Sequence, residues 1–110
     1  MTLDGWIRVA TLNDVGPGEV VGVKVAGEPV AVANVDGELL AVSDVCTHEY
    51  VLLHDGWLEG DLLECPSHGS QFDLRTGKAR SLPATKPVAV YEVRVEGDDV
   101  YVRPKADVKG

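Results

Sequence analysis

Two short segments decide how this chain is interpreted: Cys-Thr-His at residues 46–48 and Cys-Pro-Ser-His-Gly-Ser-Gln-Phe-Asp at residues 65–73. Each segment offers one thiolate and one imidazole within a few residues, so a single loop could present both side chains to a shared centre. Together the segments use both cysteines and two of the three histidines of the chain. We therefore expect Cys46, His48, Cys65 and His68 to hold one metal centre.

Two kinds of centre suit this set of ligands. Two thiolates and two imidazoles can bind a tetrahedral zinc ion, or a [2Fe–2S] cluster in which histidines replace the cysteines on one iron. Zinc fingers usually group cysteine with cysteine and histidine with histidine, whereas each segment here mixes the two types. The mixed pairing favours the two-iron cluster, and a structural zinc site remains the alternative.

The residues that follow His68, namely Gly-Ser-Gln-Phe-Asp, extend the pattern. With them the chain resembles the Rieske iron–sulfur proteins, most of all the small soluble Rieske ferredoxins, and the similarity continues through residues 55–61 and 82–85. The resemblance implies an all-β Rieske fold of stacked antiparallel sheets in a single domain, residues 1–110, with a cluster-binding subdomain at about 44–82. It also implies one [2Fe–2S] cluster, bound by the four residues named above, with Ser70 beside it.

Histidine ligation has a chemical consequence for such a cluster. Neutral imidazoles in place of two thiolates leave the oxidised centre without net charge, so adding one electron creates less negative charge in a poorly polarisable loop pair. The reduction potential rises accordingly, within a range of about −150 to +300 mV for Rieske centres.

Neighbouring residues place this chain toward the low end of that range. High-potential relatives carry a disulfide between two further cysteines, where this chain has Val51 and Ser67. They also carry a serine and a tyrosine whose hydroxyls bond to sulfur; Ser70 matches the serine, but Phe72 replaces the tyrosine and has no donor. Fewer donors aimed at a negative centre make reduction less favourable.

The rest of the chain predicts β-structure. Apolar residues alternate with charged ones in segments such as 21–25 and 91–96, and glycine-containing turn signals separate short apolar runs. We expect strands near 6–10, 19–25, 29–35, 38–43, 61–64, 70–73, 78–80, 88–96 and 99–103. The surest hairpin joins 29–35 to 38–43 across Asp36-Gly37, and at most one helical turn, capped by Thr11, is expected at 11–15.

Composition excludes several classes of function. The formal net charge is −8, without a basic cluster, which makes nucleic acid and anionic membranes poor partners. The N-terminus lacks the features of a signal peptide, no apolar stretch is long enough to span a membrane, and both cysteines are committed to ligation. We expect a cytoplasmic monomer.

Several other residues have modest expected roles. His54 is interpreted as an ordinary turn residue, and Trp6 and Trp57 as core or rim packing. Glu49 and Tyr50 follow His48 directly and could shape a docking surface or simply pack within the loop. Pro83 resembles the proline of the loop that covers the cluster in the family, and Gly69 lets the backbone approach closely or adopt positive φ.

These observations predict an electron carrier and not an enzyme. Once the cluster is bound, only His54 remains, so a mononuclear iron site with two histidines cannot be built, and no dinucleotide fingerprint is present. The family resemblance supplies the partners: a flavoprotein ferredoxin reductase that uses NAD(P)H, and the terminal Rieske oxygenase of an aromatic-ring-hydroxylating system. The alternatives are a Rieske-like small subunit of a larger reductase, such as nitrite reductase, and a zinc-stabilised binding module.

Overall fold

The computed structural model describes residues 5–47, 50–67, 69–82, 84 and 86–105, and its architecture is all-β, as predicted. Nine strands and two 3₁₀ turns occur in this part of the chain: β1 (Ile7–Thr11), η1 (Leu12–Asp14), β2 (Val20–Val25), β3 (Glu28–Val35), β4 (Glu38–Ser43), η2 (Leu53–Asp55), β5 (Trp57–Glu59), β6 (Leu62–Glu64), β7 (Gln71–Asp73), β8 (Val90–Glu96) and β9 (Asp99–Pro104).

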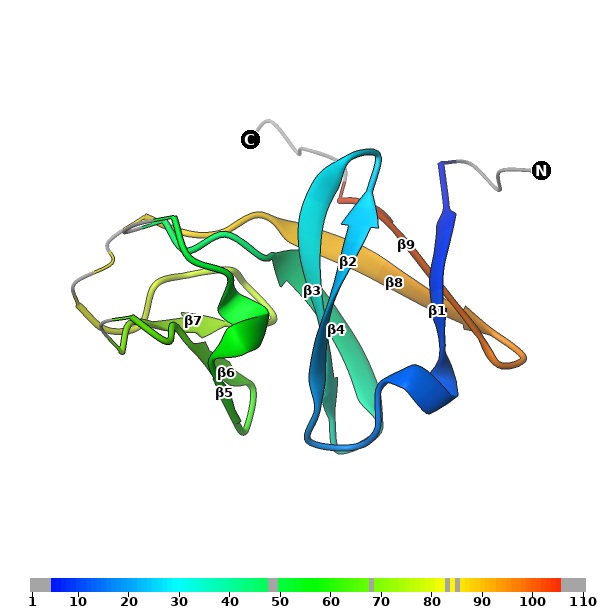
Figure 1. The fold of residues 1–110 in the computed structure, drawn as a ribbon, viewed down its shortest axis with the longest axis horizontal. Helices are drawn as coiled ribbons and strands as arrows, with labels where there is room; N and C mark the ends of the chain where they lie inside the picture. Colours follow the sequence, from blue (N-terminus) through cyan, green and yellow to red (C-terminus); the bar gives the residue numbers. More distant parts are fainter. Residues whose placement is uncertain (1–4, 48–49, 68, 83, 85, 106–110) are drawn as a thin grey trace.

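Six strands form the larger sheet, in the order β1-β9-β8-β4-β3-β2, with every pair antiparallel. The two edge strands, β1 and β2, come into contact, so the sheet curls on itself (Figure 1). The expected hairpin is confirmed: Val35 pairs with Glu38, and Asp36 and Gly37 both have positive φ, of 53° and 97°. Positive φ at both central residues is the requirement of the tight turn that matches the twist of paired strands.

Strand β3 shows how the two halves of the molecule are joined, because it is buried on both faces. Val30 and Val32 point into a valine-rich core inside the curled sheet. Ala31 and Ala33 point the other way, into a second core that also contains Leu63 and Phe72 of the smaller sheet. Small side chains on that face let the second layer approach closely.

The smaller sheet, β5-β6-β7, is antiparallel and lies beside the larger one (Figure 1). The expected strands at 61–64 and 70–73 are confirmed. The expected strand at 78–80 is wrong, because only an isolated bridge joins Ala79 to Phe72. The prediction also missed β5, whose three residues are too few to show an alternating pattern.

The expected single turn is present: a 3₁₀ turn occupies residues 12–14, with Thr11 as its N-cap. The Asp14 carboxylate accepts from the Thr11 backbone N–H at 2.9 Å and from the Thr11 hydroxyl at 3.2 Å. Within the described part of the chain, no helix is long and apolar enough to cross a membrane.

Candidate metal centre

Three segments meet at one end of the molecule, beyond the small sheet: the one that follows β4, the one that follows β6, and the one that precedes β8 (Figure 1). We call them loop 1 (residues 44–52), loop 2 (65–70) and loop 3 (81–87). Loops 1 and 2 contain the predicted ligands, and loop 3 contains the predicted covering proline. Adjacent loops on a rigid scaffold are where binding sites are usually built.

Loop 1 places Cys46 inside the protein. The thiol-bearing residue is only 3% exposed. Its backbone N–H donates to the Val51 carbonyl at 3.0 Å, and Val45 bridges to Leu52, so the loop folds back on itself like a short hairpin. The side chain of Cys46 is thereby fixed toward the core.

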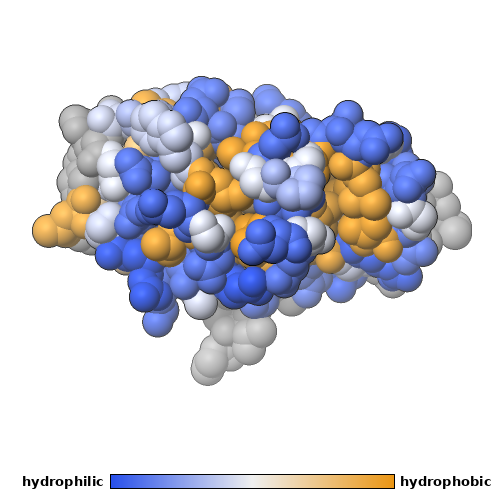
Figure 2. All heavy atoms as spheres, turned by 90° about the horizontal axis from the view of Figure 1, so that it is seen from below, coloured by the Kyte–Doolittle hydropathy of each residue, from blue (hydrophilic) through white to orange (hydrophobic). Residues whose placement is uncertain are grey.

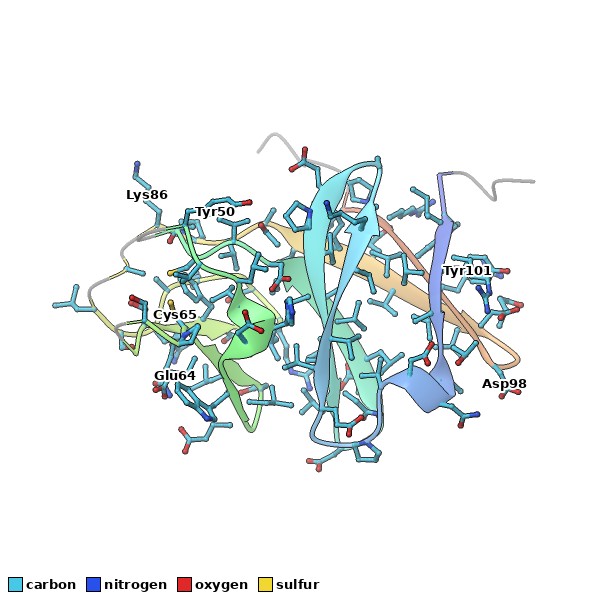
Figure 3. The ribbon with its side chains drawn as sticks, in the orientation of Figure 1. Tyr50, Glu64, Cys65, Lys86, Asp98 and Tyr101 are labelled. Carbon is cyan, nitrogen blue, oxygen red and sulfur yellow. The ribbon has the colours of Figure 1, made fainter. Side chains whose placement is uncertain are left out.

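Loop 2 is a tight turn that closes around Cys65. The Cys65 N–H donates to the Ser70 carbonyl at 2.7 Å, and the Gly69 N–H donates back to the Cys65 carbonyl at 3.2 Å. Gly69 has φ of 78°, which confirms the expected positive φ and is strained for other residues. Cys65 is 1% exposed, and Figure 3 shows it next to Glu64, which ends β6.

Both cysteines belong to one apolar cluster, with Leu53, Leu63 and Phe72 among its fully buried members. The structure therefore brings together two of the four predicted ligands from segments far apart in the sequence. His48 and His68 lie outside the described residues, as do Glu49 and Pro83. Among the described residues alone, no group of three or more histidine, cysteine, aspartate or glutamate side chains could hold a metal ion.

Ser70 connects the loops to one another. It is fully buried, and its hydroxyl oxygen accepts from the Ala84 backbone N–H of loop 3 at 3.0 Å, while its carbonyl holds Cys65 as described above. A second link joins loops 1 and 3, because the Thr47 hydroxyl donates to the Lys86 carbonyl at 2.7 Å. These bonds connect the three loops to one another. A change in the conformation of loop 3 should therefore also affect the positions of the cysteines.

Asp44 is a residue of the site that the sequence prediction missed. It is 1% exposed, and its carboxylate accepts two bonds from His54: from the backbone N–H at 2.7 Å and from ring Nδ1 at 2.5 Å. The Asp44 carbonyl also accepts from the Leu53 N–H. The pair ties the beginning of loop 1 to the turn η2 just beyond its end. An acidic residue directly after a strand and two positions before Cys46 was the available signal.

His54 is therefore more than an ordinary turn residue, and the larger sheet makes room for it. A Cβ on Gly22 of β2 would lie 2.5 Å from His54 Nδ1 and 3.0 Å from Asp44 Oδ2. Such distances are too short for any side chain at residue 22. Glycine there lets the Asp44–His54 pair pack directly against the sheet.

The remaining predicted residues are placed as follows. Phe72 is fully buried in the core beside the cysteines and offers no hydrogen-bond donor. Val51 packs against the same core, and Ser67 is exposed. Trp6 is half-buried, with the Arg103 guanidinium carbon 4.4 Å above its ring, which agrees with rim packing, whereas Trp57 is 60% exposed and does not belong to the core.

The donor set suits an iron–sulfur cluster. Thiolates are soft ligands that favour zinc and iron–sulfur centres, and two buried cysteines on adjacent hairpin-like loops could grip such a group from two sides. The surrounding leucine and phenylalanine side chains exclude water, which is one of the ways in which a protein adjusts a redox potential. Hence the described residues fit the group that the sequence implies.

Comparison with known proteins agrees with this geometry. The Rieske [2Fe-2S] domain family matches residues 5–92. The chain is 44% identical over 98 residues to the ferredoxin component of naphthalene 1,2-dioxygenase/salicylate 5-hydroxylase systems of Ralstonia sp., an alignment that covers 89% of this chain and 94% of the relative.

Solved structures give the same result. The ferredoxin of carbazole 1,9a-dioxygenase from Nocardioides aromaticivorans superposes with a TM-score of 0.86 at 36% identity, covering 91% of this chain and 98% of that one. A chain from the complex of reduced oxygenase and oxidised ferredoxin in carbazole 1,9a-dioxygenase gives 0.87 at 38% identity, covering 96% and 100%. With an all-β fold shared over almost its full length, two buried cysteines in paired loops and ferredoxin components as relatives, this chain belongs to the Rieske [2Fe-2S] domain family and is an electron-transfer component, not a catalytic one.

Proposed function

We propose that this protein carries single electrons from an NAD(P)H-dependent flavoprotein reductase to the terminal oxygenase of an aromatic-ring-hydroxylating dioxygenase system. One observation carries the proposal: two buried cysteines, Cys46 and Cys65, converge from two loops at one end of a chain whose relatives, covered over nearly their full length, are ferredoxin components of such systems. A cytoplasmic location and a monomeric state are part of the same proposal.

The proposed ligands are the thiolates of Cys46 and Cys65 and the imidazoles of His48 and His68. When bound, the [2Fe–2S] cluster supplies a one-electron redox couple. The chain's own residues do the rest. The apolar cluster around the cysteines excludes water, and Ser70 holds loop 2 against loop 3.

The buried surroundings support a low reduction potential. Phe72, at the position where high-potential relatives have tyrosine, is fully buried and cannot donate to sulfur. Val51 and Ser67 exclude the additional disulfide. A redox titration checks this directly, and a midpoint above about +100 mV, within the Rieske range, contradicts it.

The cluster end also carries the features of a transient docking surface. Tyr50 of loop 1 and Leu82 of loop 3 are 80% and 76% exposed, although both are large and hydrophobic. Large apolar side chains left in water at a functional end mark sites of protein contact. With a net charge of −8, we expect weak encounters with basic partners that become slower as salt rises.

Autonomous oxygenase activity does not fit these residues. The sequence has three histidines, and the one not assigned to the cluster, His54, is bound to the buried Asp44. A mononuclear iron site of two histidines and a carboxylate therefore lacks its ligands.

The decisive experiment is electron paramagnetic resonance of the anaerobically purified, dithionite-reduced protein, combined with analysis of iron, acid-labile sulfide and zinc. We expect a brown protein with equal iron and sulfide and a rhombic signal. A colourless protein that contains zinc would instead support the zinc-stabilised module. His68→Ala separates carrier from scaffold, since it should abolish electron delivery to an oxygenase without abolishing complex assembly.

A further inference from the structure

The outward face of the small sheet presents a tryptophan among carboxylates. Side chains alternate across a strand, and Leu58, Leu63 and Phe72 point into the core. The register pairs Trp57 with Glu64, Glu59 with Leu62, Leu62 with Asp73 and Glu64 with Gln71. The other face therefore consists of six residues, which we call the Trp57 face: Trp57, Glu59, Leu62, Glu64, Gln71 and Asp73.

Trp57 is the exposed aromatic residue of this face. Its side chain is 60% exposed, whereas the ring of Trp6 is covered by Arg103 at 4.4 Å. In the described part of the chain, no cation lies over Trp57. An exposed indole with a negative ring face is a site where an arginine or lysine can bind.

The carboxylates of this face differ in how they are neutralised. Asp73 is paired with Arg80 at 3.3 Å. Glu59 only accepts from the neutral Gln71 amide at 3.2 Å, and Glu64 has no ion pair with a described residue. Among the described residues, therefore, neither Glu59 nor Glu64 has a cationic partner, and Glu64 lies directly opposite Trp57 in the ladder.

The position of the face is as informative as its composition. Glu64 directly precedes Cys65, and Figure 3 shows the two residues together at the end of β6. Lys86 lies on the opposite side of the same end, near Tyr50 (Figure 3). Seen from below, the molecule shows separate hydrophobic patches in a largely hydrophilic surface (Figure 2). The Trp57 face therefore ends one residue from a proposed ligand, because Glu64 belongs to the face and Cys65 follows it.

We propose that the Trp57 face is a docking surface for a basic protein surface, whose central arginine or lysine stacks on Trp57 while neighbouring cations pair with Glu59 and Glu64. The occupant is an electron-transfer partner, so the proposal rests on the function proposed above and adds the face and the chemistry by which that partner is recognised. Charge complementarity mainly increases the association rate, and cation–π stacking mainly prolongs the complex.

The test uses the holoprotein and cytochrome c, a basic one-electron acceptor, as the probe. Stopped-flow absorbance follows electron transfer from the reduced protein at several ionic strengths. We compare Glu59→Gln/Glu64→Gln with a control of equal charge change, Glu28→Gln/Asp98→Asn. Glu28 and Asp98 are exposed, and Asp98 lies at the end of the molecule far from Cys65 (Figure 3).

At low salt we expect the face variant to slow the second-order rate about tenfold and the control by less than about twofold, with both converging on the wild type at high salt. Trp57→Leu should slow transfer about threefold at every salt concentration, with Trp57→Phe in between. Equal slowing in the face variant and the control would overturn the proposal, because only net charge would then matter.

Two measurements separate this proposal from the proposed function. Iron content and reduction potential are determined for each variant first, because Glu64 is adjacent to Cys65. Absence of a cluster in the wild type means that the proposed function fails. If the clusters are intact and a shifted potential fully explains the slower transfer, the docking surface is contradicted while the proposed function stands. The single variant Glu59→Gln, which is away from the loops, should retain about half of the double variant's change in the logarithm of the rate.

Discussion

The larger sheet and the cluster-binding end, which consists of the small sheet and loops 1 to 3, are held together in different ways. The six strands of the larger sheet run for five to eight residues each, and valines on their inner faces form a closed apolar core. The strands of the small sheet have three residues each. A ladder that short gives few backbone bonds and little buried area, and a two-stranded or very short sheet is marginal alone.

Polar side chains make up for this at the cluster-binding end. Asp44 binds His54, Ser70 binds the backbone of loop 3, and Thr47 binds the Lys86 carbonyl. Each such bond contributes about 1 kcal/mol, and a buried group that loses its partner costs more. The comparison teaches that one region is stabilised mainly by apolar burial, while the other depends on a few specific bonds and on the group it binds.

Removing a proposed ligand should separate the two regions most strongly. We expect Cys65→Ser to abolish the visible absorption of the cluster and to speed amide exchange in residues 44–82 by about tenfold or more. The larger sheet should keep its far-ultraviolet circular dichroism, because its core contains no cysteine. Complete unfolding of the chain would show that the larger sheet is not independent of the cluster.

A substitution at a closely packed glycine should have the next largest effect. A Cβ on Gly56 would lie 1.8 Å from the Glu64 carbonyl oxygen of β6, so Gly56→Ala must displace the small sheet, at a cost of about 3 kcal/mol. Gly97→Ala, in the β8–β9 turn, meets nothing within 4 Å and has only its φ of 61° against it, which costs about 1 kcal/mol. Urea unfolding measures the free energy of unfolding of both variants. If Gly56→Ala and Gly97→Ala lose equal amounts of stability, the distinction between the two regions is not supported.

Ser70 tests how far the polar bonds matter for function. Ser70→Ala leaves the Ala84 N–H without its partner, and we expect about 1–2 kcal/mol less stability together with a lower reduction potential. Ser81→Ala is the control. It removes the hydrogen bond that the Ser81 hydroxyl accepts from the Gln71 N–H at 3.0 Å, and this hydroxyl is more exposed than that of Ser70. Protein-film voltammetry should show a shift for Ser70→Ala only. An equal shift in both would indicate a general loosening of the loops.

The smallest effect is expected for the ion pair that connects the two regions. Arg75, just after β7, binds both carboxylate oxygens of Glu38 in β4 at 2.8 and 3.0 Å. This bond lowers the pKa of Glu38 below its ordinary 4.5, so its stabilising contribution is present above that pH and is lost as pH falls through the folded-state pKa.

Melting temperatures from circular dichroism check this linkage. Arg75→Gln should melt slightly below the wild type at neutral pH, and the difference should vanish in acid. Because both groups are exposed, salt should also reduce it. Arg94→Gln, which removes a pair within β8 alone, is the control. A difference that persists in acid would exclude Glu38 as the cause.

Sequence patterns predicted the larger sheet better than the small one, for a physical reason. Long strands such as β3 and β8 repeat the alternation of side chains often enough to be recognised, and Asp36-Gly37 has the chemistry of a hairpin turn. In contrast, β5 contains three residues, and Ala79 forms only a bridge. Pairing in such short segments is decided by tertiary packing, which local sequence does not encode.

The candidate site also contains features that the sequence predicted and features that it did not. Cys46 and Cys65 could be predicted because their spacing and neighbours are distinctive. The bonds that position them could not, since Ser70 and Ala84 are separated by fourteen residues and Thr47 and Lys86 by thirty-nine. Asp44 is adjacent in sequence to a predicted strand end, yet its partner His54 becomes evident only when loop 1 has folded.

The place where the cluster-binding end leaves and rejoins the larger sheet has an engineering consequence. Strands β4 and β8 are neighbours, with Val42 opposite Val90 and the Ser43 N–H bonded to the Ala89 carbonyl at 2.8 Å. The whole segment between β4 and β8 is thus inserted at a single point of an otherwise continuous sheet. Such an insert could be exchanged for that of a relative, carrying its redox properties with it, without altering a single strand of the host.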